Sequence, residues 1–101
     1  MGSVRLKINP SLASMATANW HSAYLNVEYQ LDGAATIGEV LSNFTREHPE
    51  YAGIFFDPAN GKISDAINVT LNRNMLVSSQ ADKVRIKDGD TILILPIYEG
   101  G

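Results

Sequence analysis

Residues 87–101 read KDGDTILILPIYEGG, and this ending guides the interpretation of the whole chain. Within it, Thr91–Leu95 carries four successive apolar residues. An unbroken apolar run of this length is typical of a strand covered on both faces, and therefore of a central strand. The Asp88-Gly89-Asp90 turn precedes the strand. Pro96 is expected to end its pairing, because proline has no amide proton to donate.

The residues after this strand form a predicted flexible tail, 96–101. When extended, such a tail reaches about 20 Å, far enough to enter a partner's active site. Glycine has no side chain, so a terminal glycine pair can pass through a narrow channel. The terminal carboxylate is ionised at neutral pH and must be activated before it can carry a chemical group. The tail consists of Pro96, Ile97, Tyr98, Glu99, Gly100 and Gly101.

Apolar residues occupy every second position in three further stretches, which is the pattern of half-buried strands. The first two are expected to pair as an antiparallel ribbon, with the segment between them folding back on the domain and Trp20 as its anchor. A short partner strand with Met75 and Val77 follows the third. The alternating sets are Val4, Leu6 and Ile8, then Leu25, Val27, Tyr29 and Leu31, then Ile67, Val69 and Leu71.

One stretch predicts an amphipathic helix. Thr36 and Glu39 have the spacing of a capping box, in which side chains bind the free amides of the first helical turn. Pro49 disfavours helical geometry in the residue before it, so the helix is expected to end near His48. The predicted apolar stripe consists of Ile37, Val40, Leu41 and Phe44.

The predicted element order is strand, strand, helix, strand, short strand, strand. One helix packed on one sheet makes a two-layer α+β sandwich. The patterns of the first and last strands are both typical of central strands. This favours a mixed sheet in which these two strands are adjacent and parallel. This is the β-grasp arrangement. We therefore expect residues 1–95 to form one β-grasp domain and residues 96–101 to form its tail, in a chain of 101 residues.

Composition argues against several functions. The net charge is −3, which disfavours a protein that binds nucleic acid. No apolar run reaches the 18 residues of a membrane span. There is no cysteine, so the chain has no thiolate nucleophile or thiolate metal site. The two histidines have no partners at metal-ligand spacing. From these observations we expect a cytoplasmic protein that is not an enzyme, binds no metal and binds no cofactor.

Three segments resemble the ubiquitin-like sulfur carriers of the MoaD/ThiS type: TIGEVLSNFTREHPE (36–50), INVTLNRN (67–74) and IKDGDTILILPIYEGG (86–101). The resemblance covers nearly the whole chain. It implies that a ubiquitin-activating-type enzyme uses ATP to adenylate the carboxylate of Gly101. Sulfur from a donor then displaces AMP and leaves a thiocarboxylate. The resemblance also implies that the sheet surface and the strand ending at Leu95 dock the partner enzymes.

The resemblance leaves the pathway open. Molybdopterin-type members usually have phenylalanine-proline-proline before the tail, whereas Leu95-Pro96-Ile97 is closer to the cysteine-pathway carrier. The family usually has a small residue where this chain has Glu99. The pathway favoured for the sulfur is molybdopterin synthesis. In that pathway the synthase large subunit would accept the sulfur, and this chain would be the non-catalytic small subunit. The alternatives are a cysteine or other thio-metabolite pathway, a protein modifier joined to lysines, and an interaction module with an inert tail.

Overall fold

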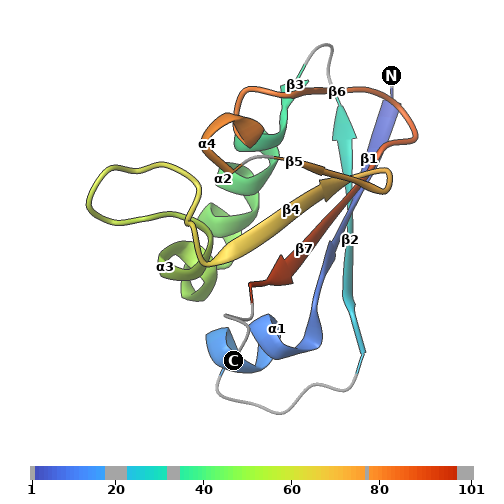
Figure 1. The fold of residues 1–101 in the computed structure, drawn as a ribbon. Helices are drawn as coiled ribbons and strands as arrows, with labels where there is room; N and C mark the ends of the chain where they lie inside the picture. The colour runs from blue at the N-terminus through green and yellow to red at the C-terminus, as the bar shows by residue number, and fades with distance from the viewer. Residues whose placement is uncertain (1, 18–22, 32–34, 77, 98–101) are drawn as a thin grey trace.

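The computed structural model describes residues 2–17, 23–31, 35–76 and 78–97. Its centre is a mixed five-stranded sheet in the order β2-β1-β7-β4-β5 (Figure 1). The central strand β7 is parallel to β1 and antiparallel to β4. The predicted adjacency of the first and last strands is therefore confirmed, and the fold is a β-grasp. The strands are β1 (Gly2–Ile8), β2 (Leu25–Leu31), β4 (Ile67–Leu71), β5 (Asn74–Leu76) and β7 (Thr91–Pro96).

The helical layer contains more than the one predicted helix. The main helix is α2 (Ile37–Glu47), which lies across one face of the sheet (Figure 1). Five further elements are too short to show a periodic pattern, and the sequence did not predict them. They are the 3-10 turn η1 (Pro49–Tyr51), the helices α3 (Ala52–Phe55) and α4 (Ser78–Ala81), and the paired strands β3 (Ala35–Thr36) and β6 (Arg85–Ile86).

Helix α2 begins and ends where the sequence predicts. The hydroxyl of Thr36 accepts a hydrogen bond from the amide of Glu39 at 3.2 Å and donates to the Glu39 carboxylate at 3.4 Å. At the other end, His48 is the C-cap, directly before Pro49. All four residues of the predicted stripe are buried. The local signals of capping and periodicity therefore determine this helix.

The segment after β1 is partly as expected. Pro10 begins α1 (Pro10–Thr17), a position where proline's missing amide proton costs nothing. The side chain of Asn9 accepts a hydrogen bond from the amide of Ser11 at 2.8 Å, and Leu12 is buried against the core. The segment thus folds back on the domain as a short helix. The predicted anchor Trp20 lies outside the described residues.

The core lies between α2 and one face of the sheet. Inward-facing residues of β1, β7 and β4 are almost completely buried, as their alternation predicts. The β2 side chains of Leu25, Val27 and Tyr29 also pack against this core, but they are only partly buried because β2 is an edge strand. The fully buried strand residues are Val4, Leu6, Ile8, Ile67, Val69, Ile92 and Ile94. In the described part of the chain, no helix is long and apolar enough to cross a membrane.

Two expectations about β7 are wrong. Only Ile92 and Ile94 are buried, whereas Leu93 and Leu95 are partly exposed, because the helices cover a single face of the sheet. The strand also continues to Pro96, which pairs with Ile67. Proline cannot donate to the ladder, but it keeps its carbonyl and its extended backbone. β7 is therefore central in the hydrogen-bonded sheet while one of its faces remains open.

The partner strand β5 differs from its prediction in register. Met75 was expected to be one of its apolar residues, but it is 67% exposed and pairs with Thr70 on the open face. Leu76 instead pairs with Val69 and packs against the core. A one-residue shift exchanges the two faces of a strand, and a strand of three residues has too little pattern to define its register. Val77 lies outside the described residues.

Tyr29 is expected to make stability sensitive to alkaline pH. In the described part of the chain its hydroxyl is buried without a hydrogen-bond partner. Burial, together with the negative charge of Glu47, raises the pKa of Tyr29 from 10 to about 12. Between these pH values the unfolded chain releases a proton that the folded chain keeps, so the free energy of unfolding falls as pH rises.

The variant Tyr29→Phe tests this sensitivity. Removing an unsatisfied hydroxyl should stabilise the fold by about 1 kcal/mol at pH 7. The variant should also lose less stability than the parent between pH 10 and 12 in urea titrations. Equal alkaline slopes for the two proteins would contradict the assignment to Tyr29.

Candidate functional site

The end of β7 carries the chain out of the sheet. Pro96 is held by pairing with Ile67, and the amide of Ile97 donates to the carbonyl of Ala66 at 3.0 Å. Ile97 is 41% exposed. The predicted tail residues Tyr98, Glu99, Gly100 and Gly101 lie outside the described residues. The structure therefore places Pro96 and Ile97 beside Ala66 and Ile67, and the function of the tail residues remains a prediction.

In the part of the chain that the structure describes, no helix covers the face of the sheet opposite α2, which is called here the open face. The strand registers place one residue from each strand in a continuous row across it: Asn26, Lys7, Leu93, Thr70 and Met75. The two apolar members, Leu93 and Met75, are the residues whose exposure the sequence did not predict. In this row, side chains at paired positions are direct neighbours.

A groove of about 530 Å³ lies on this open face. It runs across β1, β7 and β4 and reaches the turn between β4 and β5. Leu93 supplies its apolar part, and polar or positively charged side chains supply the rest. The lining residues are Lys7, Thr70, Asn72, Arg73, Thr91 and Leu93.

The open face has a charge opposite to that of the whole chain. Among the described residues that line its two pockets, Arg5, Lys7 and Arg73 are basic, and Glu28 and Asp90 carry carboxylates. Glu28 is directly across from Arg5 in the β1–β2 register, so their charges offset each other in part. The chain as a whole has a net charge of −3. A surface of this kind attracts a negatively charged partner surface.

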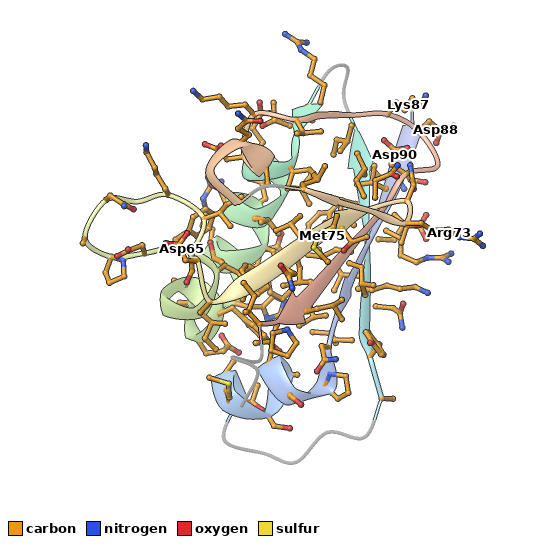
Figure 2. All side chains as sticks on the ribbon, viewed as in Figure 1. Asp65, Arg73, Met75, Lys87, Asp88 and Asp90 are labelled. Carbon is orange, nitrogen blue, oxygen red and sulfur yellow. The ribbon has the colours of Figure 1, made fainter. Side chains whose placement is uncertain are left out.

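A buried carboxylate holds the turn beside the groove. Asp90 is 5% exposed and accepts hydrogen bonds from the side-chain amide of Asn72 at 2.7 Å and from the amide of Lys87 at 2.8 Å. The side-chain oxygen of Asn72 in turn accepts from the amide of Thr91 at 2.8 Å. These bonds connect the β4–β5 turn to the start of β7. Figure 2 shows Asp90 beside this turn, with Arg73 projecting from it.

The Asp88-Gly89-Asp90 segment is a turn, as predicted. The carboxylate of Asp88 accepts from the amide of Ser3 at 2.9 Å, and Gly89 has a positive φ of 87°. The carbonyl of Ser3 accepts from the amide of Gly89 at 2.9 Å. The carboxylates of this turn therefore bind backbone amides and fasten the start of β1 to the start of β7.

Comparison with known proteins decides the family. The ThiS family model matches residues 22–101 of the chain. The chain belongs to the ThiS family. Small archaeal modifier protein 3 of Haloferax volcanii is 26% identical over 76 residues, which is 75% of this chain and 80% of that protein.

Solved structures agree with this family. The crystal structure of SAMP1 from Haloferax volcanii superposes with a TM-score of 0.72 at 28% identity, covering 99% of this chain and 100% of that chain. A chain in the crystal structure of the BexX/CysO complex from Amycolatopsis orientalis superposes with a TM-score of 0.68 at 24% identity, covering 97% of this chain and 99% of that chain. At this lower identity the likeness concerns the fold alone.

The predicted resemblance is therefore confirmed: this ThiS-family chain has the fold of the ubiquitin-like sulfur carriers. The family consists of small ubiquitin-like carrier proteins. The sequence missed the charged groove on the open face, and its prediction of a reactive tail stays a prediction. The only sequence signal for that groove was the pair Arg5 and Lys7, which alternates with the buried residues of β1.

Proposed function

We propose that this ThiS-family chain is a sulfur carrier and that Gly101 is its reactive residue. In the first step, an oxygen of the Gly101 carboxylate attacks the α-phosphorus of ATP in a ubiquitin-activating-type enzyme, and pyrophosphate leaves. In the second step, a sulfur nucleophile attacks the carbonyl carbon of the acyl-adenylate, and AMP leaves. The net change replaces one carboxylate oxygen with sulfur. The observation that carries the proposal is the family match, which extends through Gly101.

The fold supports the division of work between the domain and its tail. β7 is anchored on both sides, and it leads directly into Pro96 and Ile97. From this fixed point, Tyr98, Glu99 and Gly100 would extend into the partner's active site and present Gly101. The chain itself would act as a substrate that binds no cofactor, and ATP would be consumed by its partner in the cytoplasm.

The pathway proposed first is molybdopterin synthesis, in which the synthase large subunit accepts the sulfur. Supply of sulfur for cysteine or another thio-metabolite is the alternative within the same chemistry. Both pathways use the same thiocarboxylate on Gly101. They differ in the acceptor protein, so mixing the thiocarboxylated chain with each acceptor and following sulfur release distinguishes them.

A second candidate function is protein modification. It is favoured by the Haloferax volcanii relatives, both of which carry the name of small archaeal modifier proteins. In this function the ε-amine of a target lysine attacks the activated carbonyl of Gly101, AMP leaves, and an isopeptide bond forms. The last basic residue is Lys87, so trypsin would leave the long remnant 88–101 on the target. A protease that cleaves after glutamate would cut at Glu99 and leave a Gly-Gly remnant.

Intact-mass spectrometry tests the carrier function. The purified chain is incubated with the adenylating enzyme of its own host, ATP, magnesium and sulfide. We expect a gain of about 16 Da, the mass difference between sulfur and oxygen in the transferred group. Omitting ATP is the control and should leave the mass unchanged. Failure to gain this mass in the complete reaction would contradict the proposed function.

A further inference from the structure

The outer edge of β2 is the longest unpaired strand edge in the described part of the chain. β2 pairs with β1 along all seven of its residues, and among the described residues no strand pairs with its other side. The strand at the opposite edge of the sheet, β5, has only three residues. An unpaired edge presents free backbone amides and carbonyls, to which a further strand can bind.

β2 lacks the features that usually protect an edge strand. Its sequence, LNVEYQL, contains no lysine and no proline, and its register with β1 runs without a bulge. Its single charged residue is Glu28, which lies directly across from Arg5 and is therefore offset in part. Natural sheets prevent pairing between edges with short strands, charged side chains, prolines or bulges. The β2 edge is therefore competent to pair with another strand.

Hydrogen bonds of β1 show which residues of β2 face the free edge. The amide of Arg5 donates to the carbonyl of Asp90 at 3.0 Å, so the backbone groups of Arg5 point away from β2. Arg5 pairs with Glu28, and residues opposite each other in an antiparallel pair exchange either both hydrogen bonds or none. Glu28 therefore directs its amide and carbonyl to the free edge. Backbone groups alternate along a strand, so those of Asn26 and Gln30 point the same way.

We propose that two copies of the chain pair through their β2 edges, antiparallel and about a two-fold axis at Val27. The backbone groups of Asn26 and Glu28 then exchange hydrogen bonds across the interface. A two-fold interface uses the same edge of both copies, so only the register has to be chosen. A register centred on Glu28 would place two carboxylates directly opposite each other, which destabilises a sheet. Centred on Val27, Glu28 of one copy faces the neutral Asn26 of the other.

This register also complements a positive charge on the open face. Lys7 pairs with Asn26 on one side and with Leu93 on the other, so no carboxylate lies directly across from it. In the proposed register, Glu28 of the second copy faces Asn26 and joins the row that contains Lys7. The two backbones are then about 10 Å apart, a distance that long side chains of opposite charge can largely span. The second copy therefore brings a carboxylate toward this lysine.

The other face of the joined sheet gains apolar contact. Val27 faces Val27 of the second copy, and Leu25 faces Tyr29. In the single chain these three side chains pack against the core but stay partly exposed, so their contact removes apolar surface from water. The two five-stranded sheets become one sheet of ten strands. Because the copies run antiparallel, the two β7 strands end at opposite sides, and the pairing is independent of the proposed carrier function.

Sedimentation equilibrium of the purified chain between about 10 and 500 µM tests the pairing. We expect a monomer at the lowest concentration and a dimer at the highest. Glu28→Pro should weaken association at least about thirtyfold, because it removes one outward amide from each copy. It leaves the hydrogen bonds between β1 and β2 in place, so circular dichroism should show a folded chain. The matched control, Glu28→Gln, keeps the amide and should associate within about threefold of the parent.

A single introduced cysteine tests the register, because the chain contains no cysteine of its own. Val27→Cys lies on the proposed axis, where the paired residues exchange no hydrogen bonds and their Cα atoms are about 4.5 Å apart. This distance lies within the range for a disulfide. Mild oxidation should therefore link two copies of Val27→Cys. Met75→Cys is the control, because Met75 is 67% exposed on the strand at the opposite edge and should link only by random collision.

The outcomes decide the proposal. A monomer over the whole concentration range overturns the pairing, and so does association that Glu28→Pro leaves unchanged. Equal linking of Val27→Cys and Met75→Cys overturns the interface at β2. Linking of Tyr29→Cys in preference to Val27→Cys overturns the register centred on Val27. A dimer that Glu28→Pro dissociates and Val27→Cys links supports both the interface and its register.

Discussion

Adding one alanine after Gly101 will abolish the gain of about 16 Da that the parent chain shows with its adenylating enzyme, ATP and sulfide. The added residue moves the terminal carboxylate about 3.5 Å along an extended chain. It also places a Cβ atom on the terminal residue, where glycine leaves space. A shift of about 1 Å in a reacting group already lowers reaction rates by orders of magnitude. Intact-mass spectrometry on both proteins measures the result.

The matched control for this prediction is a change in the tail that keeps its end. Glu99→Gln removes one charge and retains Gly100 and Gly101, so it should still gain the mass. The extended chain should melt at the same temperature as the parent, because the added alanine lies outside the core. An unaltered mass gain in the extended chain would show that the terminal glycine is not the reactive residue.

Phe44→Ala will lower the free energy of unfolding by about 3–5 kcal/mol. Phe44 belongs to α2 and is completely buried, and its ring lies 4.9 Å from that of Tyr51 and 5.6 Å from that of Phe55, measured between centroids. Truncation removes these contacts and leaves a cavity that the neighbouring elements can fill only in part. For a domain of about 100 residues, this loss lowers the melting temperature by at least about 12 °C.

The control for Phe44→Ala is Asn43→Ala, one residue earlier on the exposed side of the same helix. Surface changes of this kind usually stay within about 0.5 kcal/mol. Urea titrations of both variants and the parent measure the difference. If Phe44→Ala costs less than about 1 kcal/mol, the aromatic cluster does not contribute to the core as its burial indicates.

Several features of this protein were determined by the sequence alone. Helix α2 is specified by Thr36 at its start, Pro49 after its end and a stripe at helical spacing, all of which act within a few residues. The strands β1, β2 and β4 are specified by alternation, because successive side chains of a strand point to opposite faces. The predicted order of these elements then limited the fold to a β-grasp. The reactive role of the terminal glycines stays a prediction from the sequence.

Only the tertiary structure decided which surfaces stay open. Leu93 and Leu95 are as apolar as Ile92 and Ile94, so composition could not show that one face of β7 lacks a covering layer. Met75 and Leu76 differ in exposure because of register across a three-residue strand. Lys7 and Arg73 are 66 positions apart in the sequence and meet at one groove through the pairing of β1, β7 and β4. Such proximity arises from contacts between distant segments, which no local pattern encodes.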